Sequence, residues 1–311
     1  MAQEVVRTSS DFRPEQGAVF DLSSRAKLRI VGADRLRYLN GQITNDLRKA
    51  SGASAIHACV LSAKGKINAE VFIAAEGEAF LVDTDPGMGD QLAARLERYI
   101  IADDVQIEDL TEEFALFHVI GANVPALADG QKHRQVERFG IVGTDVWMSR
   151  AERDSGLQVL SQTFSICEEG CAETFRIERG LPRWGRELTD EIIPTEANLE
   201  ASAIDFAKGC YIGQEVISRI KMSGQTNKRL CGLLPESQVP LTPGMRLMTT
   251  EEKKDVGWVT SAVMSGRLGR QIALGFLKRG FQTPGVRLCA VSEEPVLASP
   301  LAVTVVSLPF L

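Results

Sequence analysis

The sequence predicts an α+β protein of two or three domains that ends in an antiparallel β-barrel. Its 311 residues exceed what one typical hydrophobic core organises, which indicates more than one domain. Between residues 55 and 148, strand-like and helix-like segments are mixed, as in an α+β unit. After residue 226, short alternating apolar runs follow one another, separated by Pro and Gly turns. Six or more such strands without helices are typical of a small barrel.

The first predicted elements are a strand-like segment and a helix. Residues 17–31 alternate in hydrophobicity, and Gly32 interrupts the run. Asp34 then stands where the N-cap of a helix is expected. The apolar side of this helix would consist of Leu36, Leu39, Ile43 and Leu47.

A β-hairpin, a third strand and a second helix are expected next. The hairpin strands lie at 55–62 and 67–74, and the turn lies at 64–66. A strand at 79–83 leads through Pro86 into the helix. The helix has an apolar stripe of Leu92, Leu96, Tyr99 and Ile100, and further strands are expected near 105–107, 115–120 and 146–148.

The composition argues against nucleic-acid and membrane partners. Hydrophobic residues make up 44% and charged residues 24% of the chain, as in ordinary globular proteins. The formal net charge of −6 makes the chain a poor candidate for binding a phosphate backbone. No apolar run approaches the ~20 residues that span a bilayer, and residues 1–16 are polar, without the apolar core of a signal peptide. We therefore expect a cytoplasmic protein, and a monomer.

The cysteines do not predict a metal site. Cys59, Cys231 and Cys289 lie in strand-like segments, where we expect buried structural thiols. Cys167 and Cys171 form a C-x3-C pair that offers two ligands. None of the three histidines lies near this pair in the sequence, and a closed zinc or cluster site needs four ligands.

The most informative segment is the octapeptide at residues 208–215, Lys-Gly-Cys-Tyr-Ile-Gly-Gln-Glu. It places Cys210 near Lys208 at the start of a helical apolar pattern. The free N–H groups of a helix N-terminus and a nearby cation both favour the nucleophilic thiolate. The alternative is a glycine-rich loop whose cysteine merely packs. The apolar pattern consists of Ile212, Val216, Ile217 and Ile220.

This octapeptide resembles the signature of the YgfZ family, Lys-Gly-Cys-Tyr-x-Gly-Gln-Glu. Those proteins are folate-binding relatives of the glycine-cleavage T-protein, an aminomethyltransferase, and act in the assembly or upkeep of iron–sulfur proteins. Shorter blocks similar to the T-protein and YgfZ pattern occur in the same order along nearly the whole chain. They lie at 21–23, 44–47, 176–180, 185–188, 193–197, 259–261 and 272–275.

The resemblance implies a three-domain ring of the T-protein/YgfZ type around a central folate cavity. Residues 1–50 together with 155–225 would form a discontinuous central folate-binding domain. Residues 51–154 would form an α+β domain, and residues 226–311 the C-terminal β-barrel. Ligand pockets commonly form where domains meet, which agrees with the signature lying in the central region.

The resemblance also implies tetrahydrofolate as the cofactor. Glu178, in an Arg-x-Glu-x-Gly sequence, would be the carboxylate that anchors the pterin. The alternative for Glu178 is a surface glutamate paired with a neighbouring arginine. Trp184 and Tyr211 are candidates for packing against the ring, or alternatively core residues. Gln214, within the signature, is placed with the folate-binding residues.

The tail of folate carries glutamate carboxylates, which require cations. Lys208, Lys221 and Lys228 with Arg229 lie near the signature in the sequence. Clustered lysines usually form a solvated face. Lys208 is the strongest candidate of these because it lies inside the signature.

One stretch departs from the T-protein pattern. That family holds an aspartate near the reacting amine in a Gly-Gly-Ile-x-Asp-Asp sequence, which residues 65–70 resemble. Ala69 and Glu70 stand at the positions of the paired aspartates. Alanine cannot take a proton or balance a cationic intermediate, and strand alternation would point Glu70 to the other face. This departure argues against the transferase reaction.

Three hypotheses for function follow. The first is a tetrahydrofolate-dependent factor that maintains iron–sulfur client proteins, including radical enzymes of tRNA modification. Cys210 would be its redox or cluster-contacting thiol, tuned by Lys208. The second is an aminomethyltransferase that transfers a one-carbon unit to tetrahydrofolate. The third is a folate-binding or partner-binding module without turnover.

Overall fold

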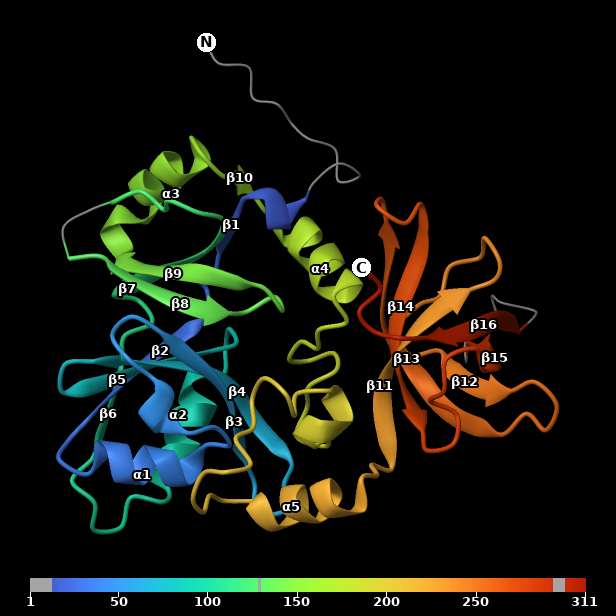
Figure 1. The fold of residues 1–311 in the computed structure, drawn as a ribbon, viewed down its shortest axis with the longest axis horizontal. Coiled ribbons are helices and arrows are strands. Elements are labelled where there is room, and N and C mark those ends of the chain that lie inside the picture. The colour runs from blue at the N-terminus through green and yellow to red at the C-terminus, as the bar shows by residue number, and fades with distance from the viewer. Residues whose placement is uncertain (1–12, 128–129, 293–299) are drawn as a thin grey trace.

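Two five-stranded sheets and a closed six-stranded barrel make up the fold (Figure 1). The computed structural model describes residues 13–127, 130–292 and 300–311. Most of the polar segment at residues 1–16 lies outside these ranges. The two sheets lie at one end of the longest axis and the barrel lies at the other (Figure 1). Helix α4 and the chain that follows it lie between them.

The first sheet has the strand order β10-β1-β7-β9-β8. Its strands are β1 (Ala18–Asp21), β7 (Phe114–Ile120), β8 (Lys132–Glu137), β9 (Val142–Ser149) and β10 (Ser165–Ile166). Strands β1 and β10 are parallel, and the other neighbours are antiparallel. Alternation along β1 packs Val19 in one cluster with Leu160 of α3 (Arg153–Ser161). Phe20 packs in another cluster with Phe175 of α4 (Glu169–Glu178).

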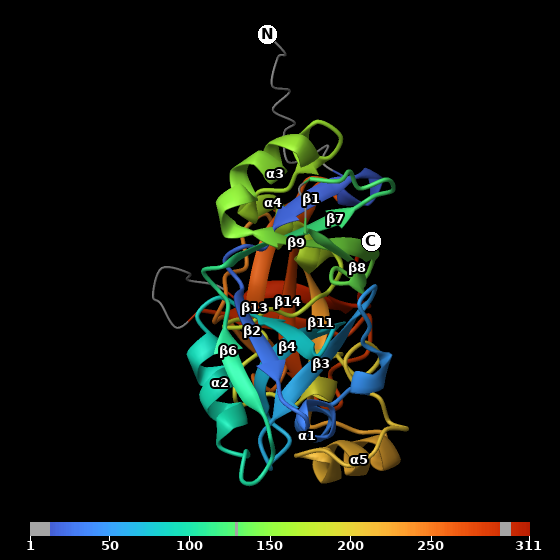
Figure 2. The ribbon, with the colours of Figure 1, turned by 90° about the vertical axis from the view of Figure 1, so that its left-hand side faces the viewer.

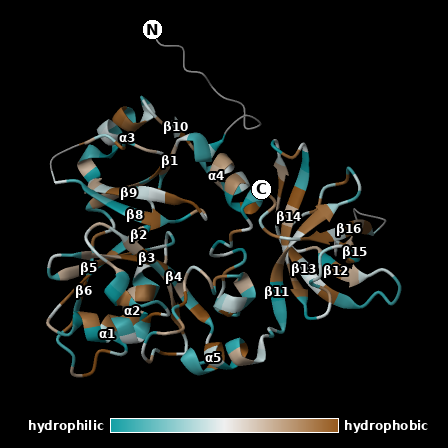
Figure 3. Ribbon diagram, viewed as in Figure 1, coloured by the Kyte–Doolittle hydropathy of each residue, from teal (hydrophilic) through white to brown (hydrophobic). Residues whose placement is uncertain are grey.

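The second sheet has the order β3-β4-β5-β2-β6 and is antiparallel throughout. Its strands are β2 (Ala26–Val31), β3 (Ala55–Leu61), β4 (Ile67–Glu76), β5 (Ala79–Thr84) and β6 (Gln106–Asp109). Helices α1 (Arg35–Gln42) and α2 (Gly89–Glu97) cover one face of this sheet and bury an apolar core against it. The predicted hairpin and third strand are therefore present. Figure 3 shows hydrophilic and hydrophobic segments alternating along α1 and α2, as expected of helices with one buried side.

Helix α1 is shorter than the sequence predicts. The helix ends at Gln42, and Ile43 has an extended backbone that forms a bridge with Val60 of β3. Pairing with the sheet thus replaces the last predicted turn. Asp34 does precede the helix, but its side chain does not cap it. Its carboxylate instead accepts a hydrogen bond of 2.9 Å from the backbone N–H of Asp104.

The C-terminal barrel closes in the order β11-β14-β13-β12-β15-β16. The strands are β11 (Lys228–Pro235), β12 (Arg246–Thr249), β13 (Asp255–Ser265), β14 (Arg270–Lys278), β15 (Arg287–Val291) and β16 (Leu301–Val306). Every pair of neighbours is antiparallel, and the interior is filled by a separate apolar cluster that includes Leu233, Leu247 and Val259. The predicted α+β fold with a C-terminal antiparallel barrel is confirmed.

The predicted domain boundaries stay a prediction. The two sheets pair strands that lie on opposite sides of the predicted boundaries near residues 50 and 155. Strand β2, which precedes residue 50, pairs with β5 in the second sheet. Strand β1 pairs with β7 on one side and with β10 on the other. Hydrogen bonding therefore ties residues before 50 to both sheets.

The chain between α4 and α5 (Gln214–Ser223) joins the sheets to the barrel. It is mostly irregular, with one short 3-10 helix at Pro194–Ala197. An apolar cluster holds it in place, combining Leu61 of β3, Ile177 of α4 and Phe276 of β14. Figure 2 shows the barrel strands behind the second sheet when the molecule is turned. Within the described ranges, no helix is both long and apolar enough to span a membrane.

Candidate functional site

A cavity of about 670 Å³ lies where the two sheets, α4 and the following chain meet. Its lining residues all fall between Phe20 and Ser202, so the cavity belongs to the part of the chain that precedes the barrel. They come from β1 and the loop after it, β3, β4, the start of the β5–α2 loop, the end of β8 and the turn after it, α3, the segment from β10 through α4, and residues 180–202.

Strand β4 directs Glu70, and not residue 69, into the cavity. Ala69 is 1% exposed and packs in the core that α1 and α2 cover, whereas Glu70 and Phe72 line the cavity. Side chains alternate between the two faces of a strand, and helices occupy the face of Ala69. The interpretation that alanine at position 69 removes the carboxylate of the site is therefore wrong, because the cavity-facing position keeps a carboxylate.

His57 holds the Glu70 carboxylate in place. The Nε2 atom of His57 lies 2.8 Å from Oε1 of Glu70, and its ring is stacked on Phe72 at 4.7 Å between centroids. Burial opposes ionisation of Glu70. The hydrogen bond and charge of His57, with the charges of Arg25 and Arg138, outweigh burial and hold the pKa of Glu70 below its usual value.

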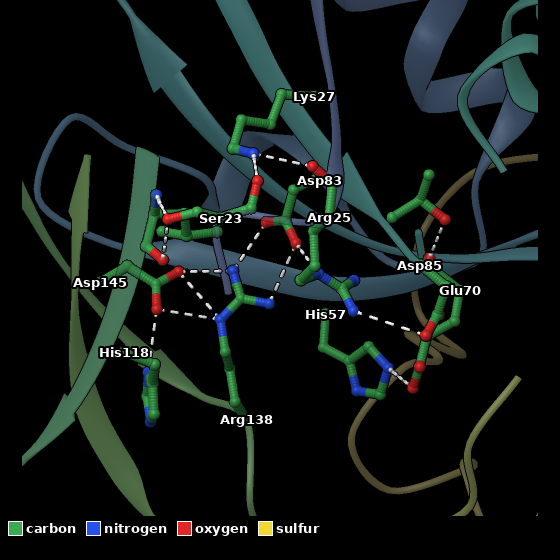
Figure 4. A network of polar contacts seen from close by, with 12 residues as sticks. Ser23, Arg25, Lys27, His57, Glu70, Asp83, Asp85, His118, Arg138 and Asp145 are labelled. Atoms are coloured by element: carbon green, nitrogen blue, oxygen red, sulfur yellow. Dashed lines mark hydrogen bonds and ion pairs between the residues drawn. The ribbon is translucent and has the colours of Figure 1, made fainter. Parts of the chain in front are cut away.

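Asp85 and Arg25 form a second polar pair at the cavity wall (Figure 4). Oδ1 of Asp85 lies 3.7 Å from Nη1 of Arg25. Oδ2 of Asp85 and Nη2 of Arg25 are buried, and neither has a hydrogen-bond partner among the residues described. Burial raises the pKa of Asp85, with further contributions from the carboxylates of Glu70 and Asp83, although Arg25 opposes the shift. The pair thus offers one donor and one acceptor that no described residue satisfies.

A buried ion-pair network supports this wall from behind (Figure 4). Arg25 donates from Nε to Asp83, and Nη2 of Arg138 lies 2.6 Å from both Asp83 Oδ2 and Asp145 Oδ2. Nδ1 of His118, which is fully buried, lies 2.8 Å from Asp145. Burial opposes ionisation of Asp145, but Arg138 and His118 lower its pKa to about 2. The network fixes the position of Arg25 before any ligand arrives.

Aromatic rings supply the apolar part of the cavity wall. Phe20 and Phe139 both line the cavity, and their rings are stacked at 4.3 Å between centroids. Phe72 also lines it, with the guanidinium of Arg138 4.1 Å from its centroid. Flat apolar surfaces beside a few polar groups suit a planar heterocycle.

Glu178 lies away from this cavity. It is the last residue of α4 and is 2% exposed. Its Oε1 accepts a hydrogen bond of 2.6 Å from Ser265 Oγ, and its Oε2 lies 3.5 Å from Arg267. On the same helix, Glu173 and Arg176 line the cavity instead. Glu178 thus joins α4 to the barrel, and its predicted role as pterin anchor stays a prediction.

The signature loop lies against α1. Nζ of Lys208 donates to the carbonyls of Asn40, Ile43 and Asn45 at 2.6, 2.7 and 2.8 Å. Burial lowers the pKa of Lys208 to about 8. The three N–H bonds of the ammonium group are therefore used on the chain around the end of α1, and the predicted tuning of Cys210 by Lys208 stays a prediction.

Cys210 is exposed and precedes α5. The helix begins at Gln214, after Gly213 with φ of +85°. A Cβ atom on Gly213 would lie 2.6 Å from the carbonyl oxygen of Ser62. Only glycine at this position therefore allows the loop to approach the β3–β4 turn so closely. The exposed thiol is thus presented by a loop that is fixed on both sides.

The other predicted folate residues also lie outside the cavity lining. Tyr211 and Trp184 are half-buried and pack against the apolar cluster between sheet and barrel. Burial raises the pKa of Tyr211 to about 12. Gln214 accepts a hydrogen bond of 3.2 Å from the backbone N–H of Tyr211. The structure thus brings Lys208, Tyr211 and Gln214 together in the signature loop and leaves the cavity to other residues.

Several cavity residues escaped the sequence analysis, namely His57, Arg25, Asp85 and Arg138. A usable signal was present around β5, where Asp83 interrupts an otherwise apolar strand and Asp85 directly follows its end. Charged residues in a buried strand are rarely tolerated without partners. Within the described ranges, no group of three or more His, Cys, Asp and Glu side chains is placed to hold a metal ion.

Comparison with known families agrees with this architecture. The family model described as "GCVT N-terminal domain" matches residues 2–146, and "Glycine cleavage T-protein C-terminal barrel domain" matches residues 228–311. The chain is a GcvT-like protein. The crystal structure of aminomethyltransferase T from Bartonella henselae shares the fold of this GcvT-like protein, with a TM-score of 0.80 at 17% identity over 95% of this chain and 86% of the other.

This GcvT-like protein is similar in sequence to two kinds of curated protein. An "Iron-sulfur cluster assembly factor IBA57 homolog, mitochondrial" from Dictyostelium discoideum is 26% identical over 68% of this chain, which spans 61% of that relative's length. An "Aminomethyltransferase" from Rubrobacter xylanophilus is 27% identical over 99% of this chain and 84% of the relative. Sequence similarity alone therefore does not separate the two functions.

Proposed function

We propose that this GcvT-like protein binds tetrahydrofolate in the central cavity and acts in the assembly or upkeep of iron–sulfur proteins. The observation that carries the folate part is the cavity with aromatic walls and two unsatisfied polar atoms, Oδ2 of Asp85 and Nη2 of Arg25. Its volume of about 670 Å³ falls in the usual range for small-molecule sites.

The lining residues fit the chemistry of a pterin. One edge of that ring carries adjacent N–H donors and a carbonyl acceptor. Asp85 and Glu70 offer carboxylate oxygens to N–H donors, and Arg25 offers an N–H to a carbonyl. Phe20, Phe72 and other apolar lining residues would cover the ring faces.

The iron–sulfur part is supported by relatives and by one exposed thiol. The relatives from Dictyostelium discoideum and Chaetomium globosum are both named iron–sulfur cluster assembly factors, and both names place them in mitochondria. Cys210 is exposed within a signature that resembles that of YgfZ. We infer that this thiol contacts client proteins, among them radical enzymes of tRNA modification, with the cytoplasm as the proposed location.

Calorimetric titration with tetrahydrofolate tests the folate part. Asp85→Asn should weaken binding about tenfold, because a carboxylate hydrogen bond to a buried N–H is lost. Cys210→Ser should bind as tightly as the parent, since Cys210 does not line the cavity. Asp90→Asn, an exposed change on α2, is the matched control. Absence of saturable binding by the parent would disprove the folate proposal.

Rescue of an iron–sulfur enzyme in cells that lack this protein tests the other part. Cys210→Ser should fail to restore the activity of the enzyme, although it retains the folate site. Full rescue by Cys210→Ser would show that the thiol is not required and would remove it from the proposal.

A second candidate function is aminomethyl transfer to tetrahydrofolate, favoured by Glu70. This carboxylate faces the cavity and is held by His57 at 2.8 Å. A fixed carboxylate can stabilise a cationic intermediate or receive a proton. An assay with an aminomethyl-lipoyl donor protein should then show turnover by the parent and a loss of at least about 100-fold in Glu70→Gln. No turnover by the parent excludes this candidate.

A further inference from the structure

A second hollow, of about 510 Å³, lies beside the central cavity. Asp21, Ser24 and Arg153 line both spaces, so the two are contiguous. The lining of the second hollow is entirely polar or charged, in contrast to the aromatic walls of the cavity. Its residues are Asp21, Ser23, Ser24, Arg150, Arg153 and Asp154.

The hollow contains an arginine without a carboxylate partner. Nη1 of Arg150 donates to the carbonyl of Ser23 at 2.7 Å, and Arg150 forms no ion pair with any residue that the structure describes. Arg153 pairs with Asp21 and Asp154. By contrast, Arg25 and Arg138 of the neighbouring cavity wall are paired with aspartates.

A buried lysine adds positive charge beneath the hollow. Nζ of Lys27 donates to the carbonyl of Ser23 at 2.8 Å (Figure 4). Because Arg150 also donates to it, this carbonyl receives hydrogen bonds from two cations. Burial, together with the positive charges of Arg150 and Arg25, lowers the pKa of Lys27 to about 8, against the opposing charges of Asp83 and Glu112. Arg150 and Lys27 carry like charges and donate to the same carbonyl, so they repel each other. An anion bound between them would relieve this repulsion.

We propose that the second hollow binds the glutamyl carboxylates of the folate tail, an inference that rests on the proposed folate function. The planar guanidinium group of Arg150 matches a carboxylate and is accompanied by Arg153 and the Ser24 hydroxyl. Because Asp21, Ser24 and Arg153 line both spaces, the tail of a ligand whose ring occupies the cavity extends past these residues into the hollow.

The cations near the signature are engaged elsewhere. Lys208 is used on three backbone carbonyls, and Lys221 lies over the ring of Phe206. The two remaining cations, Lys228 and Arg229, pair with Glu196 and Glu200. The proposal therefore moves the tail site from the signature to Arg150 and Arg153.

The test compares two ligands that share a ring but differ in the tail, tetrahydropteroate and tetrahydropteroyl-triglutamate, by calorimetry. The parent should bind the triglutamate at least about tenfold more tightly. The double variant Arg150→Gln with Arg153→Gln should bind both ligands within about twofold of each other. Arg150→Gln alone, at a residue that does not line the central cavity, should lower the preference for the triglutamate and keep the parent's affinity for tetrahydropteroate. Arg37→Gln, a surface change on α1, is the matched control and should keep the full preference.

A second variant alters the charge in the opposite direction without breaking the Arg153–Asp21 pair. The side chain of Asp154 is 90% exposed and competes with the ligand for Arg153. Asp154→Asn should increase the preference for the triglutamate about threefold, and added salt should reduce the preference. An unchanged preference in the double variant, or no preference in the parent, overturns the tail site while leaving the folate function standing. Failure of the parent to bind either ligand overturns both.

Discussion

The guanidinium group of Arg138 lies 2.6 Å from the carboxylate of Asp83, and this contact joins the two sheets. Arg138 directly follows β8 in the first sheet, whereas Asp83 belongs to β5 in the second. The side chains are 3% and 2% exposed. Because Arg25 also donates to Asp83, the same ion pair fixes the arginine that faces the cavity.

Removal of Arg138 should therefore strongly destabilise the protein. In Arg138→Met, the carboxylates of Asp83 and Asp145 lose their shared partner and remain buried. We expect a loss of about 3–5 kcal/mol in the free energy of unfolding, measured by urea denaturation. Arg37→Met, which breaks an exposed pair, should change the free energy of unfolding far less. A loss below about 1 kcal/mol in Arg138→Met would mean that the buried pair does not hold the sheets together.

The signature contains two glycines that differ in their structural requirement. Gly213 has φ of +85°, and a Cβ atom there would lie 2.6 Å from the carbonyl oxygen of Ser62. A Cβ atom on Gly209 would meet nothing within 4 Å. Gly213→Ala should lower the free energy of unfolding by more than about 1 kcal/mol, whereas Gly209→Ala should change it by less than about 0.5 kcal/mol. Equal effects in urea denaturation would contradict the close approach of the loop to the β3–β4 turn.

Local patterns predicted the strands of the second sheet and the barrel because each depends on alternation within a few residues. The hairpin of β3 and β4 and the strands after residue 226 follow this rule. Alternation also shows that Ala69 and Glu70 face opposite sides of β4. It does not show which side faces the cavity, since that depends on where α1 and α2 pack. The error about position 69 arose at this step.

Contacts between distant segments explain the other differences at the site. Lys208 lies two residues before Cys210 in the sequence, but its ammonium group contacts carbonyls of Asn40, Ile43 and Asn45. Asp85 and Arg25 come from different segments, and only the pairing of β2 with β5 brings them together. No periodicity in the sequence contains this information. Charged residues in apolar strands were the available signal, and they indicate that partners exist without naming them.

The cysteines should react with iodoacetamide in an order that follows burial. Cys210 is exposed, whereas Cys59, Cys167 and Cys231 are buried. Burial raises the pKa of these three thiols, to about 11 for Cys231. Under native conditions, mass spectrometry should find Cys210 labelled first and the buried thiols protected until urea is added. Labelling of Cys59 as fast as Cys210 would contradict the position of β3 in the core.

The lowered pKa of Lys208 predicts how stability changes with pH. Burial places the pKa at about 8 in the folded protein, below its value of 10.5 in the unfolded chain. Between these values the unfolded chain binds more protons, so rising pH stabilises the folded state. Lys208→Met lacks this contribution. Urea denaturation from pH 7 to pH 10 should therefore show the parent gaining stability relative to Lys208→Met above about pH 8. A constant difference between the two proteins across this range would show that the Lys208 ammonium group is not perturbed by its buried position.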